Sequence, residues 1–277
     1  MNGSKPLYFE SFGNKDLPAI VFLHGGGAAG WMWRKQVEAL STRYQCLVPD
    51  LPEQGQSVNS GAFSMEKAAD LVADLICNQA HEGKAHIVGL SEGAQVAVAM
   101  LSRHPEVIDH AVISSAILHP LPGMQVYTPG LIRASHRWFV EPLKNNNWWI
   151  KLNMQYAAGI PDDYFDDFKR SFQSTTEDGF THMMLANLHF RLPSGLEQFQ
   201  NPVLVVTGSK EYKQMKESAR DLLSVLPHAH GVVVDLGSKA TLPQEHNWAL
   251  TAPELFSMTI VAFIEDKQLP SELIEFV

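Results

Sequence analysis

An apolar segment that runs directly into a Gly-x-Ser-x-Gly sequence constrains the fold of this chain more than any other feature. Residues 85–90 have the composition of a buried strand, Gly-Leu-Ser-Glu-Gly occupies 89–93, and an apolar helical pattern follows from Ala94. The glycines lack Cβ atoms, so the strand can turn sharply into a helix and leave Ser91 in a strained, exposed conformation. The N–H groups and positive dipole end of that helix would point to the same place. The pattern predicts a strand–turn–helix unit that presents a nucleophilic serine.

Short apolar runs alternate with helical periodicity on both sides of this unit. Such alternation is typical of an α/β fold, a mostly parallel central sheet with helices on both faces. Strands are expected at 8–12 (an edge strand), 19–23, 44–48, 85–90, 107–113, 203–207 and 231–234. Helices are expected at 33–40, 65–79, from 94 to about 104, 212–226 and 252–264, and Ser64 is a suitable N-cap for the second of these.

The alternation stops between residues 116 and 201, where no parallel strand is recognisable. This stretch is rich in aromatic residues, among them Trp138, Trp148, Trp149, Tyr156, Phe165, Phe168 and Phe172. Because the strand pattern resumes afterwards, the stretch is interpreted as a helical insertion between two strands. The sequence therefore predicts a core domain from residues 1–115 and 202–277, with an insertion at 116–201.

Charge and composition restrict the partners of the chain. The formal net charge is −9, which argues against nucleic acid or an anionic membrane as partner. No run reaches the roughly 18 consecutive apolar residues of a membrane-spanning helix, so no membrane insertion is expected. The start of the chain lacks the apolar core of a signal peptide. Cys46 and Cys77 are interpreted as buried free thiols, so a reducing, cytoplasmic location is expected. No cluster of metal ligands is visible, and the oligomeric state is left open.

A glycine-rich segment, His24 to Gly27, follows the first buried strand. Its backbone can expose N–H groups, which stabilise a developing oxyanion together with the N–H of the residue after the nucleophile. These donors would be Gly26, or alternatively Gly27, and Glu92. The alternative interpretation is a flexible glycine turn that binds phosphate, although the spacing matches a dinucleotide motif poorly. His24 itself is expected to brace the loop.

A nucleophilic serine needs a base, and the base needs a carboxylate that orients it. His246 is the best-placed base, because it follows the strand at 231–234 after a loop; His228 and His230 precede that strand and are expected at the surface. Glu211 lies just past the strand at 203–207, at the sheet edge where open parallel sheets bind ligands. Asp235, at the end of the next strand, is the alternative acid. Glu211 could instead simply open the following helix.

Together these segments resemble the α/β-hydrolase superfamily over nearly the whole chain. The glycine loop, the serine turn and the order Ser91, Glu211, His246 carry the resemblance, and Pro49 to Ser57 is similar to the family's Pro-Asp-Leu-Pro-x-x-Gly-x-Ser segment. The resemblance implies an α/β-hydrolase fold in which 116–201 is a cap over the active site. The chain departs from the family pattern by a glutamate at 211 where aspartate is usual, by the acidic Glu92, and by an N-terminus too short for the usual leading hairpin.

The resulting hypothesis is a serine hydrolase that cleaves small to medium carboxylic esters without a cofactor. The cap aromatics and Met124, Met154, Met183 and Met184 favour a neutral, apolar substrate, with Trp31, Trp138 and Trp149 as candidate contacts. One alternative is a carbon–carbon bond hydrolase of the same fold, whose glycine loop usually contains a proline. A second is a non-catalytic receptor or interaction protein, although such members commonly lose the nucleophile or the histidine.

Overall fold

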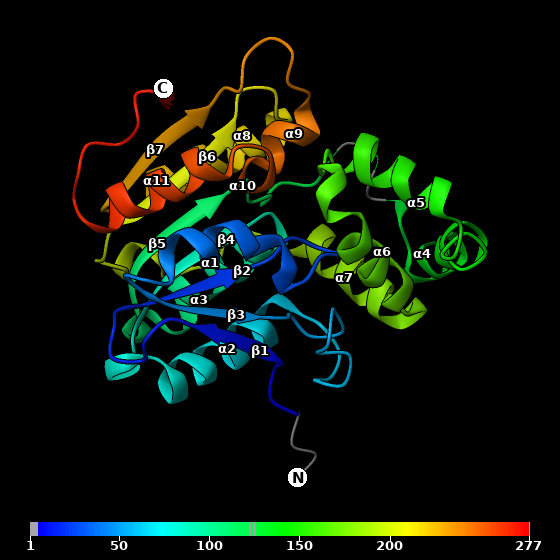
Figure 1. The fold of residues 1–277 in the computed structure, drawn as a ribbon, viewed down its shortest axis with the longest axis horizontal. Coiled ribbons are helices and arrows are strands. Elements are labelled where there is room, and N and C mark those ends of the chain that lie inside the picture. Colours follow the sequence, from blue (N-terminus) through cyan, green and yellow to red (C-terminus); the bar gives the residue numbers. More distant parts are fainter. Residues whose placement is uncertain (1–4, 122, 124–125, 277) are drawn as a thin grey trace.

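The computed structural model describes residues 5–121, 123 and 126–276, and these form one eight-stranded sheet flanked by helices (Figure 1). The strands are β1 (Phe9–Phe12), β2 (Ala19–Leu23), β3 (Gln45–Pro49), β4 (Ala85–Leu90), β5 (Ile108–Ser114), β6 (Val203–Gly208), β7 (Ala229–Val234) and β8 (Leu273–Glu275). Their order is β1-β3-β2-β4-β5-β6-β7-β8. The predicted α/β fold with a mostly parallel sheet is therefore confirmed.

The six central strands are parallel, whereas β1 pairs antiparallel with β3 and β8 pairs antiparallel with β7. Strand order reverses at β2, because β3 lies on one side of β2 and β4 lies on the other. Open parallel sheets bind their ligands at such a reversal, beyond the carboxyl ends of the strands. The loop after β2 and the turn after β4 therefore meet at the position favoured for a site. Within the described part of the chain, β1 is the one strand before β2.

Helices cover both faces of the sheet and divide its core into two layers. The core helices are α1 (Arg34–Leu40), α2 (Met65–Gln79), α3 (Glu92–Arg103), α8 (Lys213–Val225), α9 (Leu242–His246), α10 (Trp248–Thr251) and α11 (Pro253–Ile264). Residues of α2, α3 and α8 share one apolar cluster with Val21 and Leu23, and residues of α1, α10 and α11 share the other with Ile20 and Phe22. Neighbouring strand residues enter opposite layers because strand side chains alternate in direction.

Helix α2 begins where the sequence predicts, with the Ser64 hydroxyl accepting a hydrogen bond from the Lys67 N–H at 3.2 Å. Its predicted apolar stripe faces the core, and Val72 and Ile76 are fully buried. The expectation that Cys77 is buried is wrong, because this thiol is exposed, whereas Cys46 is buried as predicted. Cys77 follows Ile76 and lies at the margin of the apolar stripe, on the side of the helix that faces solvent.

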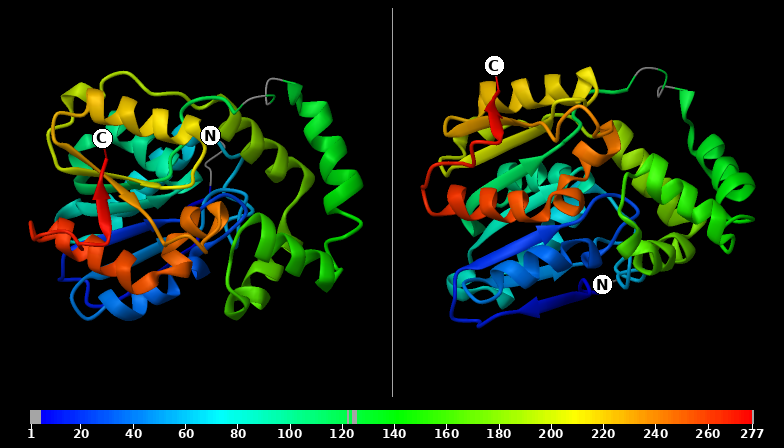
Figure 2. Two further views of the ribbon diagram at one scale, coloured as in Figure 1. Left: turned by 90° about the horizontal axis from the view of Figure 1, so that it is seen from above. Right: turned by 45° about the horizontal axis from the view of Figure 1, so that its top comes forward.

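Between β5 and β6 the chain forms the insertion helices α4 (Pro129–Ser135), α5 (Asn147–Leu152), α6 (Phe165–Ser174) and α7 (Glu177–His189). They lie beyond the carboxyl ends of the parallel strands, on one side of the molecule in all views (Figures 1 and 2). The described residues of the insertion contain no strand. Near its end, Phe190, Leu196 and Phe199 pack into the core layer of α2 and α3. A division into two domains at residues 116 and 201 stays a prediction.

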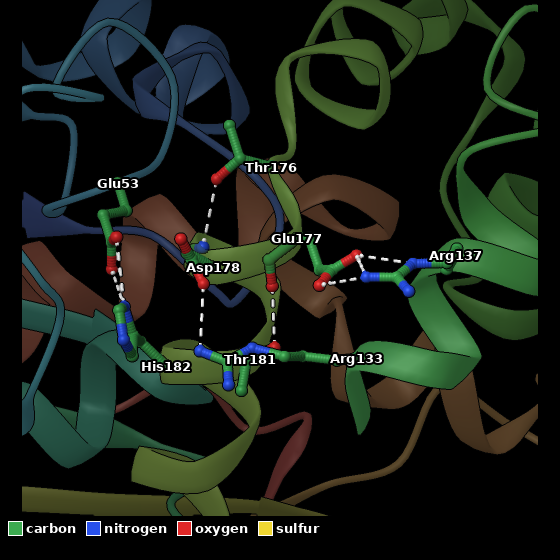
Figure 3. Close-up of polar contacts among 9 residues, drawn as sticks. Glu53, Arg133, Arg137, Thr176, Glu177, Asp178, Thr181 and His182 are labelled. Carbon is green, nitrogen blue, oxygen red and sulfur yellow. Dashed lines mark hydrogen bonds and ion pairs between the residues drawn. The ribbon is translucent and has the colours of Figure 1, made fainter. Parts of the chain in front are cut away.

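Helix α7 connects the other insertion helices to the core. The His182 Nδ1 lies 2.8 Å from the Glu53 carboxylate in the loop after β3 (Figure 3). At its N-terminal end, the helix uses Glu177 and Asp178 to hold Arg137 and Arg133 at 3.1 and 3.0 Å. These two ion pairs are exposed, so they contribute little to stability.

Two regions differ from the sequence-based expectation. Strand β8 was not predicted, because its three residues are too few for a recognisable pattern. His246 was expected to follow a loop, but it ends the short helix α9, and Thr241 caps that helix in a capping box with Gln244.

In the described residues no helix is long and apolar enough to cross a bilayer. Met124 lies outside the described residues.

Candidate active site

Ser91 occupies a strained turn between β4 and α3. Its backbone has φ 56° and ψ −115°, a combination that residues other than glycine rarely adopt. A Cβ at Gly89 would lie 2.4 Å from the Gly93 carbonyl oxygen, and a Cβ at Gly93 would lie 2.1 Å from that of Leu23. Both glycines are therefore required by close backbone approach, and Gly93 brings α3 against β2. This geometry agrees with the predicted nucleophile turn.

The loop after β2 is held by a buried histidine. The His24 Nε2 accepts the Leu51 N–H at 2.9 Å, so its Nδ1 carries the proton and donates to the Gly25 carbonyl at 2.9 Å. Burial lowers the pKa of His24, which is consistent with a neutral ring that can accept. His24 therefore braces the loop, as the sequence suggested.

The N–H groups of the glycine loop differ in availability. The Gly27 N–H donates to the Gln54 side-chain oxygen at 2.7 Å, so it is already engaged. The Gly26 N–H has no acceptor among the residues that the structure describes, and neither does the Glu92 N–H at the first position of α3. Of the two candidate donors in the loop, Gly26 is the one left available to a ligand.

His246 and Glu211 come from the segments that follow β7 and β6, and their side chains contact one another. Glu211 follows β6, its side chain is fully buried, and its Oε1 lies 2.8 Å from the His246 Nδ1. Asp235, the alternative acid, is exposed and accepts the Gly237 N–H in its own turn. His228 and His230 are exposed, as expected. The structure thus pairs Glu211, and not Asp235, with the candidate base.

Ser91 and His246 line the same cavity of about 210 Å³, together with the glycine loop and Trp31. Apolar groups form most of the remaining wall: Ala28, Met32, Ala157, Ala158, Ile160, Phe168 and Leu250. Trp138 is 72% exposed, and neither Trp138 nor Trp149 lines this cavity. Of the three candidate tryptophans, the structure brings only Trp31 to the site. Within the described residues, no group of three or more His, Cys, Asp or Glu is arranged to hold a metal ion.

Comparison with known proteins identifies the family to which this fold belongs. The family model described as alpha/beta hydrolase fold matches residues 18–192 of the chain. The chain belongs to the α/β-hydrolase fold family. Among curated relatives, the carboxylesterase YbfK of Bacillus subtilis (strain 168) is 27% identical over 262 residues, covering 91% of this chain and 82% of that protein. An AB hydrolase superfamily protein of Gibberella zeae is 30% identical over 131 residues, which cover 47% of this chain and 44% of that protein.

Solved structures extend the likeness of fold along the chain. The enol-lactonase from Burkholderia xenovorans LB400 superimposes with a TM-score of 0.72 at 20% identity, covering 94% of this chain and 96% of that one. At this identity the likeness concerns the fold alone.

In this α/β-hydrolase, Asp50 shows what the Pro-Asp-Leu-Pro segment does. Its Oδ1 accepts the Gly30 N–H and its Oδ2 accepts the Gln56 N–H, both at 2.7 Å. A Cβ at Gly55 would lie 2.2 Å from Oδ2, so the segment needs glycine there. The carboxylate therefore ties the end of the glycine loop to the segment after β3.

Sequence reasoning missed Glu245, the residue before His246. Its side chain is fully buried, accepts the Lys210 N–H at 2.8 Å, and pairs with the Lys210 Nζ at 2.7 Å. The Ser209 hydroxyl also donates to it at 3.1 Å. Glu245 therefore joins the helix that carries His246 to the loop that carries Glu211. An acid adjacent to the base was visible in the sequence, but its partner 35 positions away was not.

The side chain of Glu92 was noted in the sequence for its charge but not for its contacts. It is 1% exposed, and burial raises its pKa to about 7, while hydrogen bonds from Gln54 and Asn187 oppose that rise. Neither amide was recognised as part of the site, because they come from the loop after β3 and from α7.

Proposed function

We propose that this protein is a serine hydrolase that cleaves carboxylic esters of small to medium size. The observation that carries the proposal is the shared cavity of Ser91 and His246, with His246 hydrogen-bonded to the buried Glu211. A nucleophile in a strained turn, a base beside it and a carboxylate behind the base are the three parts that serine-dependent acyl transfer requires.

In this mechanism the Ser91 hydroxyl attacks the acyl carbon while the His246 Nε2 accepts its proton. Glu211 holds the imidazole through Nδ1 and stabilises its charged form. The N–H groups of Gly26 and Glu92 stabilise the oxyanion of the tetrahedral intermediate. The intermediate collapses as His246 returns the proton to the departing alcohol. Water, deprotonated by His246, then attacks the acyl carbon. The bond from that carbon to the Ser91 Oγ breaks as His246 returns the proton to Ser91, and the carboxylic acid is released.

The lining and size of the cavity support a neutral, apolar acyl group. About 210 Å³ lies among mostly apolar side chains, and Trp31 forms part of the wall. We assign the insertion at residues 116–201 the role of a cap, since α6 supplies Phe168 to that wall. The curated relative named as a carboxylesterase supports an ester bond as the substrate. Two unpaired cysteines fit a reducing compartment, so we place the activity in the cytoplasm as part of this proposal.

A fluorophosphonate probe tests the nucleophile. The parent protein should be labelled and should hydrolyse 4-nitrophenyl acetate, whereas Ser91→Ala should do neither. Ser102→Ala is the matched control, because Ser102 lies on the same helix and its hydroxyl donates to the Ser194 carbonyl at the surface. Absence of labelling in folded parent protein would contradict the proposal. A panel of esters and short thioesters of increasing acyl length would then define the substrate.

A further inference from the structure

The carboxylate of Glu92 joins three separate segments beside the nucleophile. Its Oε1 accepts a hydrogen bond from the Gln54 side-chain amide, and its Oε2 accepts one from the Asn187 side-chain amide, each at 2.5 Å. Glu92 opens α3 directly after Ser91, Gln54 lies in the loop after β3, and Asn187 lies on α7. One buried side chain thus links the nucleophile turn to the core and to the insertion.

Both amides are fixed as donors by their other contacts. The Gln54 oxygen already accepts the Gly27 N–H at 2.7 Å, so its NH₂ group must face position 92. The Asn187 NH₂ group also donates to the Met183 carbonyl at 2.9 Å, which fixes its orientation too. A side chain at position 92 therefore has to accept at both ends. A carboxylate meets this requirement, whereas a glutamine would turn its own NH₂ group toward one of the donors.

The same carboxylate lies against the glycine loop. A Cβ at Gly26 would be 3.1 Å from the Glu92 Oε2 and 3.3 Å from the Met183 sulfur on α7. Position 92 and α7 therefore limit where Gly26 can lie, and Gln54 holds Gly27 next to it. Burying a carboxylate among neutral partners costs free energy. The Glu92 carboxylate is nevertheless buried directly beside the proposed oxyanion donors.

We propose that the Glu92 carboxylate is a positioning residue: through Gln54 and Asn187 it holds the glycine loop and α7 in one arrangement around Ser91. The inference rests on the proposed function and deepens it, because the arrangement it maintains places Gly26, whose N–H has no acceptor among the described residues, on the same cavity as Ser91. Displacement of a catalytic donor by about 1 Å costs on the order of 100-fold in rate.

The test uses two readouts in the full-length protein. In Glu92→Gln, exchange of the Gly27 amide proton, followed by NMR, should become at least about tenfold faster as the link through Gln54 weakens. With 4-nitrophenyl acetate, kcat should fall about 10- to 100-fold while KM changes less than about threefold, because the cavity wall is unaltered. Glu177→Gln is the matched control, an acid on α7 paired with the exposed Arg137 (Figure 3), and it should change neither readout.

A double variant separates positioning from simple loss of an acid. In Glu92→Gln with Gln54→Glu, the new carboxylate at 54 can accept both the Gly27 N–H and the amide at 92, whose oxygen accepts from Asn187. The double variant should restore the rate of Gly27 amide exchange and kcat to within about threefold of the parent. Parental exchange and kcat in Glu92→Gln, or no recovery in the folded double variant, would overturn the inference. If the parent hydrolyses no ester, the proposed function fails, and amide exchange alone decides whether Glu92 holds the loop.

Discussion

The His246 Nδ1 lies 2.8 Å from the Glu211 Oε1, although the two residues are 35 positions apart in the chain. Their meeting depends on β6 and β7, which are neighbouring parallel strands and so deliver the loops that follow them to the same edge of the sheet. The buried carboxylate can therefore orient the imidazole of His246, which lines the same cavity as Ser91.

Glu211→Gln should lower kcat for 4-nitrophenyl acetate by about a thousand- to ten-thousandfold, because an amide at this position favours the wrong tautomer of His246. Steady-state kinetics of the purified variant measure this. Asp235→Asn serves as the control and should stay within about twofold of the parent, since Asp235 caps its own exposed turn. A large loss in Asp235→Asn with none in Glu211→Gln would reverse the assignment of the acid.

Glu245→Gln should destabilise the protein by about 2 kcal/mol, because a buried acceptor of a backbone N–H and a lysine loses its charge. Urea unfolding followed by tryptophan fluorescence measures this free energy. Glu217→Gln is the matched control, since Glu217 pairs with Lys213, which is 80% exposed. The control should change stability by less than about 0.5 kcal/mol. Equal effects of the two substitutions would contradict a structural role for Glu245.

His86 should make the fold sensitive to acid. Burial, and then the nearby His110, lower the pKa of His86 from 6.5 to about 4. Between these values the unfolded chain binds a proton that the folded chain does not, so stability falls as pH decreases from about 6.5 to 4, by up to about 3 kcal/mol. His86→Phe should reduce the loss of unfolding free energy between pH 7 and pH 4.5, as measured by urea unfolding at both values. An unchanged slope would show that His86 is not responsible.

Glu92 should act in the opposite sense. Its pKa is raised from 4.5 to about 7, so between these values the folded chain holds a proton that the unfolded chain has lost. Stability from this group is full below about 4.5 and declines as pH rises to about 7, by up to about 3 kcal/mol. The free energy of unfolding of the parent relative to Glu92→Gln should therefore decrease from pH 5 to pH 8. A constant difference across that range would rule out titration of Glu92.

Gly93→Ala should prevent folding or destabilise it by more than about 4 kcal/mol, because the new Cβ would overlap backbone atoms of Leu23 and His24. Gly130→Ala is the matched control in α4, where the nearest atom to a new Cβ is 4.0 Å away. The control should be neutral or stabilise by up to about 1 kcal/mol, since alanine favours the helix. Thermal unfolding by circular dichroism compares the two, and a stable, folded Gly93→Ala protein would contradict the close approach of α3 to β2.

Local patterns determined most of the elements of this protein. The strands at 19–23 and 85–90, the Ser64 cap and the turn at Ser91 each depend on residues within a few positions of one another, so the sequence alone predicts them. The order Ser91, Glu211, His246 followed from the same reasoning, because a residue just past a parallel strand lies at the ligand-binding edge. The burial of a residue at the margin of an apolar helix stripe was not determined in this way. Cys77 is exposed although its helix was predicted correctly.

Tertiary structure decided the contacts between distant segments. Glu211 and Asp235 follow neighbouring strands, and the sequence favoured Glu211 while leaving Asp235 as the alternative. The loop geometry brings Glu211 to His246, whereas Asp235 accepts the Gly237 N–H in its own turn. The environment of Glu92 depends on Gln54 and Asn187, which lie far from it along the chain. Hydrogen bonds act over about 3 Å, and no periodic pattern in a sequence records which side chains the packing of separate elements brings within that distance. The sequence therefore determined the strands and the order of the candidate groups, and the fold decided their partners.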